Sequence, residues 1–144
     1  MPAALTREER EHFLAGIHVG VLTADEPGRG PLSVPVWYLY EPGGEIVVVT
    51  RPEARKARLL VTGARVAFCV QSEDVPPKYV TIQGRVTAAD PADVARDVKP
   101  LVRKYLGAEV GDGYVDATRP NGTNEIVVRI APERWYSRDF GRAG

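Results

Sequence analysis

Short runs of alternating apolar and polar residues dominate the chain, and turns rich in glycine and proline separate them. Alternation with a period of two places successive side chains on opposite faces of a strand. In one such run, Leu32, Val34 and Val36 share a face, whereas Pro35 and Trp37 share the other. The same pattern predicts six strands, at residues 18–23, 32–40, 45–50, 65–71, 78–88 and 125–130.

The predicted strands follow one another mainly through short turns, without a regular alternation of strand and helix. A parallel doubly wound sheet requires that alternation, so the pattern favours a mainly antiparallel β-barrel with peripheral helices. Residues 32–40 and 45–50 are predicted to form a hairpin. Pro35 marks a sheet edge, a bulge or a departure from the sheet, and Gln83-Gly84 marks a bulge or a close backbone approach.

Two helices are predicted in the first half of the chain. Thr6 followed by Glu9 has the spacing of a capping box, so the first helix begins there. A short helix is expected at about residues 52–61, because proline is tolerated in a first helical turn.

The clearest helical periodicity lies in the second half. Asp90-Pro91 resembles a helix cap followed by a first-turn proline, and Gly107 would end this helix. Residues 111–123 are predicted to be irregular.

The length and charge of the chain narrow its possible classes. Its 144 residues suit one domain, residues 1–144. Nineteen basic and nineteen acidic residues cancel, which gives no broad positive field for nucleic acid. Cys69 is the single cysteine, the first residues lack the apolar core of a signal peptide, and no run approaches the roughly 18 apolar residues of a membrane helix. These features together predict a cytoplasmic protein without membrane or nucleic-acid partners.

A basic segment after the third predicted strand is the first candidate site. Arg51, Arg55, Lys56 and Arg58 lie at the start of the predicted short helix, where unpaired backbone N–H groups favour anions. Arg55 could hold a phosphate through two parallel hydrogen bonds, and Lys56 would add a point charge. The alternative is a solvated basic helix with Glu53 as a local partner.

Two further segments could contact a ligand. A flat heterocycle could lie against the strand around Pro35 and pack on Trp37, although Trp37 and Tyr38 could instead belong to the core or to a dimer interface. Lys78 and Tyr79 open another strand and could reach a ligand, but a lysine at a strand end is more often solvated.

Several other kinds of site have little support. Two histidines and one cysteine cannot form a standard zinc cluster, and nothing marks a serine, histidine and aspartate triad. No catalytic residue is therefore assigned, and a cofactor would have to carry any reaction.

The order of these segments resembles the pyridoxamine 5′-phosphate oxidase-like split-barrel superfamily, over nearly the whole chain. The resemblance is carried by V-P-V-W-Y at 34–38, T-R-P-E-A-R-K-A-R-L-L at 50–60, P-P-K-Y-V-T-I-Q-G-R-V at 76–86 and P-E-R-W-Y-S-R-D-F at 132–140. Within the superfamily the chain is most similar to the flavin/deazaflavin oxidoreductases, a group that includes enzymes dependent on coenzyme F-420.

This resemblance implies a six-stranded split barrel that forms a homodimer, with two cofactor sites between the subunits. It gives Arg55 and Lys56 the role of holding the cofactor phosphate. Family members often carry Ser or Thr where this chain has Ala54, so Thr50 or Arg51 would substitute for that contact. The remaining implied contacts are the ring-lining residues Val34, Pro35, Val36 and Trp37, together with Lys78 and Tyr79 from the second half of the barrel.

The function implied by the resemblance is transfer of a hydride from reduced F-420, or from FMN, to a small conjugated acceptor. F-420 is slightly preferred. Vitamin B6 oxidation is not implied, because the chain lacks the longer C-terminal region of those oxidases. Two alternatives stay open: a non-catalytic protein that binds or senses FMN, F-420 or haem, and a barrel that has lost its ligand and only dimerises.

Overall fold

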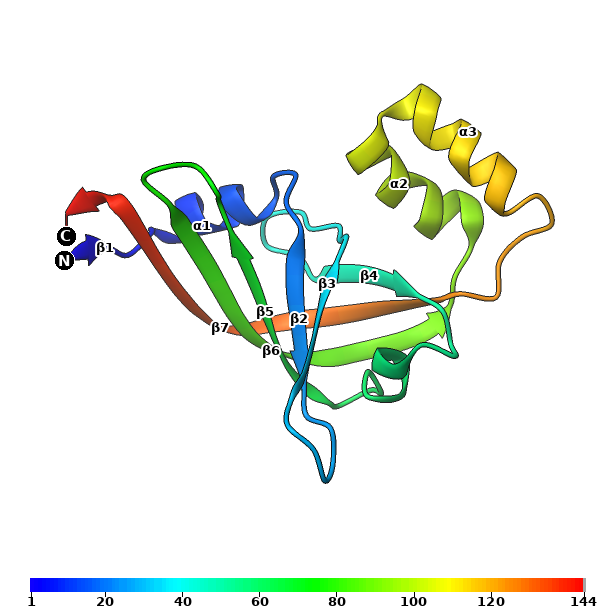
Figure 1. The fold of residues 1–144 in the computed structure, drawn as a ribbon, viewed down its shortest axis with the longest axis horizontal. Helices are drawn as coiled ribbons and strands as arrows, with labels where there is room; N and C mark the ends of the chain where they lie inside the picture. The colour runs from blue at the N-terminus through cyan, green and yellow to red at the C-terminus, as the bar shows by residue number, and fades with distance from the viewer. Residues whose placement is uncertain (144) are drawn as a thin grey trace.

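The computed structural model describes residues 1–143, which form one antiparallel sheet with helices outside it (Figure 1). The strands are β1 (Pro2–Ala3), β2 (Gly20–Ala24), β3 (Leu32–Val36), β4 (Ile46–Thr50), β5 (Arg65–Gln71), β6 (Lys78–Pro91) and β7 (Ile126–Ala143). The mainly β split-barrel class is therefore confirmed, and the two-residue strand β1 adds to the six strands that were predicted.

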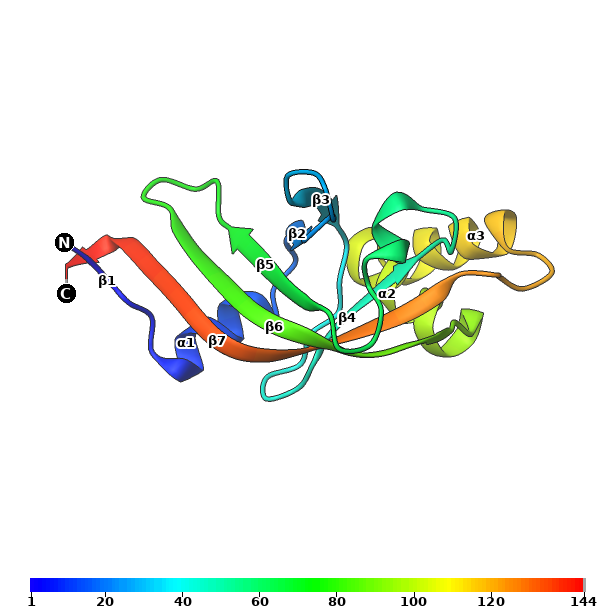
Figure 2. The ribbon, with the colours of Figure 1, turned by 90° about the horizontal axis from the view of Figure 1, so that it is seen from below.

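Strand β7 organises the sheet because both of its edges are paired. β6 runs along one edge, and β4 and β1 pair with separate parts of the other. From β6 the sheet continues through β5 and β2 to β3, and the long curved strands β6 and β7 are seen from below in Figure 2. The barrel stays open between β3 and β4, which do not pair with each other among the described residues. The chain after β3 contacts β4 only through the bridge between Leu39 and Val47.

The predicted hairpin of residues 32–40 and 45–50 is confirmed only next to its turn, where Leu39 and Val47 exchange two backbone hydrogen bonds of 2.9 Å. β3 ends at Val36 and pairs with β2, whereas β4 pairs with β7. After Val36 the chain turns so that Tyr38 enters the core, where its hydroxyl donates to the Leu14 carbonyl at 2.6 Å. The prediction that Pro35 marks a sheet edge is confirmed, since β3 ends the strand order and proline there removes no ladder donor.

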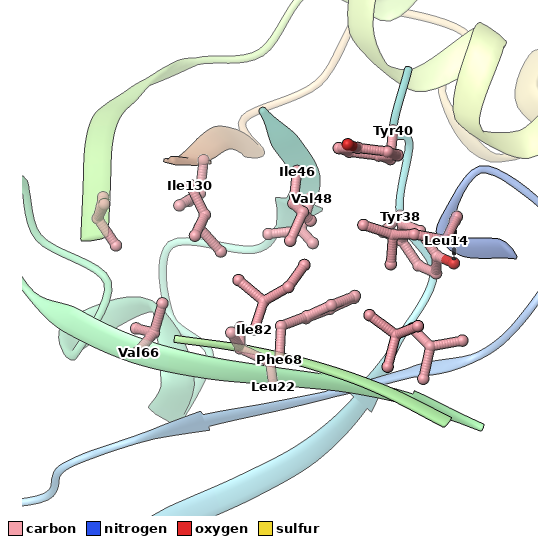
Figure 3. Close-up of a cluster of buried hydrophobic side chains, with 14 of the residues drawn as sticks. Leu14, Leu22, Tyr38, Tyr40, Ile46, Val48, Val66, Phe68, Ile82 and Ile130 are labelled. Carbon is pink, nitrogen blue, oxygen red and sulfur yellow. Dashed lines mark hydrogen bonds between the residues drawn. The ribbon is translucent and has the colours of Figure 1, made fainter. Parts of the chain in front are cut away.

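The core fills the concave side of the sheet with side chains from alternate strand positions (Figure 3). Leu22, Phe68 and Ile82 come from three neighbouring strands and are almost completely buried. Burying one side chain of this size contributes about 1.5–3 kcal/mol. Gly20 is required beside them, because a Cβ there would lie 2.1 Å from the Phe68 ring.

The first predicted helix is confirmed as α1 (Arg7–Leu14). Thr6 and Glu9 form both hydrogen bonds of the capping box, at 3.2 and 2.8 Å. The predicted short helix is the 3₁₀ helix η1 (Arg55–Arg58), which begins three residues later than expected and has no side-chain cap.

The later helical region differs from the prediction at both ends. Asp90 and Pro91 belong to the end of β6, and Asp93 is the residue that caps the helical region, through the Arg96 N–H at 2.8 Å. A π-helical turn, η2 (Val94–Val98), leads into α2 (Lys99–Leu106), and α3 (Ala108–Thr118) occupies much of the segment predicted to be irregular. α2 and α3 pack together as a pair beside the β4 end of the sheet (Figure 1).

The last predicted strand also extends much further than residue 130, because β7 continues to Ala143. Within residues 1–143, no helix combines the length and apolar character needed to cross a membrane.

Candidate functional site

A pocket of about 210 Å³ lies where the end of β3, strand β4 and the helices α2 and α3 meet. Pro35, Val36 and Trp37 form one part of its wall, and Lys56 from η1 forms another. Leu101 and Val102 of α2 contribute an apolar surface. The pocket therefore brings together a cation and the segment that sequence analysis selected as the lining for a flat ring.

Trp37 is held in place by an aromatic stack. Its ring lies 4.5 Å from the ring of Tyr105 on α2, with 5° between the planes. About 39% of Trp37 stays exposed, so the indole can contact a ligand while α2 supports its other side. Val34, the fourth predicted ring-lining residue, packs against the core and is not part of the pocket wall.

The two cations predicted to hold a phosphate have different surroundings. Lys56 lines the pocket. Arg55 instead forms an ion pair with Glu26 in the turn between β2 and β3, with Nε donating to Oε2 at 2.7 Å. This hydrogen bond lowers the pKa of Glu26 and raises the pKa of Arg55, so both groups stay charged.

Thr50 and Arg51 also point in different directions. Thr50 is 4% exposed and lies on the same face of β4 as Ile46 and Val48, and its hydroxyl has no hydrogen-bond partner among the described residues. Arg51 lines a second pocket of about 260 Å³, which shares part of its wall with the first.

Arg119, which sequence analysis did not select, is a second cation in the pocket wall. It follows α3 and forms two hydrogen bonds to Glu125, at 2.6 and 3.0 Å. The bonded guanidinium lowers the pKa of Glu125 and keeps that carboxylate ionised. No local motif marks Arg119, because it reaches the site only through the packing of α3 on α2.

Lys104 and Tyr105 on α2 form a cluster behind Trp37. The Lys104 ammonium donates to the Tyr38 carbonyl at 2.8 Å and lies 3.9 Å above the Tyr38 ring. Burial lowers the pKa of Lys104 to about 8. The Tyr105 hydroxyl donates to the His18 carbonyl at 2.7 Å, which fixes the ring that supports Trp37.

Lys78 and Tyr79 lie away from this pocket within the chain. They begin β6 and pair with Asp139 and Arg138 of β7, at the end of the sheet near the chain termini, opposite to α2 and α3 (Figure 1). A single chain therefore brings Pro35, Val36, Trp37 and Lys56 together, but not Lys78 and Tyr79.

The arrangement suits a ligand that is apolar and flat at one end and anionic at the other. A lysine or arginine beside a pocket forms charge-assisted hydrogen bonds to phosphate, and aromatic and aliphatic side chains pack on a ring. No histidine or cysteine lines this pocket. Among residues 1–143 there is also no group of three or more His, Cys, Asp or Glu side chains that could hold a metal ion.

An open antiparallel barrel with a basic, aromatic-walled pocket at its open edge is the architecture of a split-barrel protein. The chain belongs to the pyridoxamine 5′-phosphate oxidase family, whose model matches residues 6–139. A search of curated proteins found no match.

Solved structures share this fold at low sequence identity. A conserved hypothetical protein of Mycobacterium tuberculosis is 22% identical with a TM-score of 0.76, over 97% of this chain and 90% of that chain. An F420 reductase is 18% identical with a TM-score of 0.61, over 87% and 94%. A FAD-binding protein of Mesorhizobium loti is 20% identical with a TM-score of 0.65, over 96% and 98%.

Proposed function

We propose that the chain is an oxidoreductase that uses a deazaflavin or flavin cofactor, F-420 or FMN, to reduce a small conjugated acceptor. The observation that carries this proposal is the pocket that Lys56 lines together with the Pro35–Trp37 segment. Membership of the family and the likeness to an F420 reductase and a FAD-binding protein support a cofactor of this class.

In this proposal each part of the pocket wall has its own role. Lys56 binds the cofactor phosphate. Trp37 and the backbone around Pro35 orient the ring, and α2 excludes water behind them. The bound cofactor supplies a hydride, while the protein supplies position and charge.

A second copy of the chain would complete the site. The pocket of about 210 Å³ is smaller than the roughly 300–1,000 Å³ typical of ligand pockets. Pro35 and Trp37 are exposed on the outer side, where a partner could close over the ring. In a homodimer, Lys78 and Tyr79 from the far end of the partner's sheet would approach this opening.

The outer face of the sheet supports this dimer. Pro35, Val21, Cys69, Thr81 and Tyr136 are direct neighbours across five strands, and they form a row on the side away from the core. Val21 is 40% and Tyr136 49% exposed, and exposed apolar surface of this kind commonly marks an interface.

Cofactor binding and turnover are tested together on the purified protein. FMN and F-420 are titrated separately, and oxidation of reduced F-420 is then followed without oxygen in the presence of a conjugated enone. Saturable binding with acceptor-dependent oxidation is expected. If neither cofactor binds, the proposal is wrong.

A non-catalytic flavin-binding protein is the second candidate, because neither a histidine nor a protonated carboxyl group lines the pocket. Glu125 is kept ionised by Arg119, and no histidine lines the wall. Saturable binding without oxidation of the reduced cofactor by any of several enones would favour this function.

A further inference from the structure

The second pocket, here called the polar annex, adjoins the cofactor pocket. It measures about 260 Å³, and Arg51, Glu53 and Thr123 are among the residues that line it. Tyr114, Arg119 and Glu125 belong to the walls of both pockets, so the two pockets are adjacent. A ligand beside Lys56 therefore lies next to the annex, across these three residues.

The charges of the annex favour an anion beside Arg51. Arg119 already neutralises Glu125, which also accepts a hydrogen bond from the Thr123 hydroxyl at 2.7 Å. Glu53 is exposed at the annex, two residues from Arg51. Neither Arg51 nor Lys56 forms an ion pair within residues 1–143. Each pocket therefore offers one cation that forms no ion pair with a carboxylate among the described residues.

We infer that the polar annex binds a second anionic group of the same cofactor, with Arg51 as its main partner. This inference rests on the proposed function. FMN ends at its single phosphate, whereas FAD continues with a second phosphate and F-420 continues with carboxylates. The annex thus favours a cofactor that extends beyond the first phosphate.

The inference also gives Arg51 and Lys56 different effects on binding. Lys56 contacts the phosphate that all three cofactors share, so its loss weakens each of them. Arg51 contacts only the extension, so its loss weakens FAD and F-420 but not FMN. One charge-assisted hydrogen bond corresponds to roughly a ten- to hundredfold change in affinity.

The test is a titration of wild type, Arg51→Ala, Lys56→Ala and Arg58→Ala with FMN, FAD and F-420. Arg58 is the matched control, because it is an exposed cation of the same segment that lines neither pocket. Thermal unfolding of each variant is measured in parallel, and all should melt close to wild type. Arg51→Ala should lose roughly ten- to hundredfold in affinity for FAD, F-420 or both, keep its affinity for FMN, and differ clearly from Arg58→Ala.

The other outcomes separate the inference from the proposed function. If Arg51→Ala loses affinity for FAD alone, the second phosphate is the group that the annex binds. If it loses affinity for F-420 alone, the annex binds the carboxylates. If Arg51→Ala loses affinity equally for all three cofactors, or loses no more than Arg58→Ala, the annex does not bind a second anionic group. The proposed cofactor binding would still stand. Wild-type protein that binds none of the three would overturn both.

Discussion

Arg55 and Lys56 are adjacent in the sequence, but their side chains have different neighbours. Arg55 reaches across to the β2–β3 turn and pairs with Glu26, whereas Lys56 lines the pocket beside Trp37. A run of cations shows that positive charge is concentrated in the segment. The run does not show which cation binds the ligand, because that depends on where Glu26 lies after folding.

Lys56→Ala should weaken FMN binding by roughly ten- to a hundredfold, since a charge-assisted hydrogen bond contributes about 1.5–3 kcal/mol. Arg55→Ala should have a clearly smaller effect, because Glu26 already occupies its guanidinium. Isothermal titration calorimetry measures both. A larger loss for Arg55→Ala would mean that the phosphate displaces Glu26 and binds Arg55 instead.

Lys104 gives the stability a pH dependence of known sign. Its pKa is about 8 in the folded chain, against an ordinary 10.5. Between these values the unfolded chain holds a proton that the folded chain has released, so stability rises with pH. Below pH 8 Lys104 is protonated in both the folded and the unfolded chain, so this gain in stability is absent. Screening of the half-buried ammonium limits the effect to about 1 kcal/mol.

Urea unfolding of wild type and Lys104→Met at pH 7.5 and 9.5 isolates this contribution. Tyr38 and Tyr105, which face the ammonium, also have raised pKa values, so only the difference between the two proteins is interpreted. The free energy of unfolding of wild type should rise relative to the variant by up to about 1 kcal/mol. An unchanged difference would show that Lys104 keeps its ordinary pKa.

At the scale of elements, local signals predicted α1 and most strand positions, and long-range packing decided the rest. The capping box at Thr6 and Glu9 acts within four residues and could be identified from the sequence. Residues 111–123 were predicted to be irregular, yet Gly111 lies inside α3. A Cβ there would be 3.2 Å from the Arg103 backbone, so glycine permits α3 to approach α2 closely.

Strand β7 was predicted too short. Pro132 lies within it and pairs with Gly84 at a register shift between β6 and β7, where proline is tolerated. The partner strand is not visible in the local sequence of β7. The helical pair and the long β7 place Arg119 and Tyr114 in the site, so these residues could not be predicted.

The sequence prediction of a bulge or a close approach at Gln83-Gly84 is confirmed, and it leads to a stability test. A Cβ on Gly84 would lie 2.4 Å from the Ala131 carbonyl oxygen. Gly84→Ala should therefore destabilise the protein by about 2–4 kcal/mol, because the backbones of β6 and β7 must separate. Gly30→Ala is the control, since a Cβ there meets nothing within 4 Å and should change stability by less than about 0.5 kcal/mol. Similar urea midpoints for the two variants would contradict this account.

At the scale of the whole molecule, the predicted cofactor contacts lie at two ends of one open sheet. Lys56 and Trp37 lie beside α2 and α3, whereas Lys78 and Tyr79 lie near the termini (Figure 1). Contacts that are separated within one chain can meet across a twofold axis, because each end of one copy can face the opposite end of the other. The proposed dimer brings both sets of residues into each of its two equivalent cofactor sites.

Val21→Glu should separate the proposed dimer. Val21 lies in the outer row between Pro35 and Cys69, and a twofold axis would introduce the carboxylate twice. Burying two unpaired charges should weaken association at least about a hundredfold, and cofactor affinity should fall with it.

Val110→Glu is the matched control, because Val110 is 64% exposed but belongs to α3, away from this face. Light scattering at micromolar concentration should show a dimer for wild type and Val110→Glu and a monomer for Val21→Glu, with circular dichroism confirming that all three are folded. A monomeric wild type would refute the dimer and the shared cofactor site, whereas a dimeric Val21→Glu would place the interface on another face.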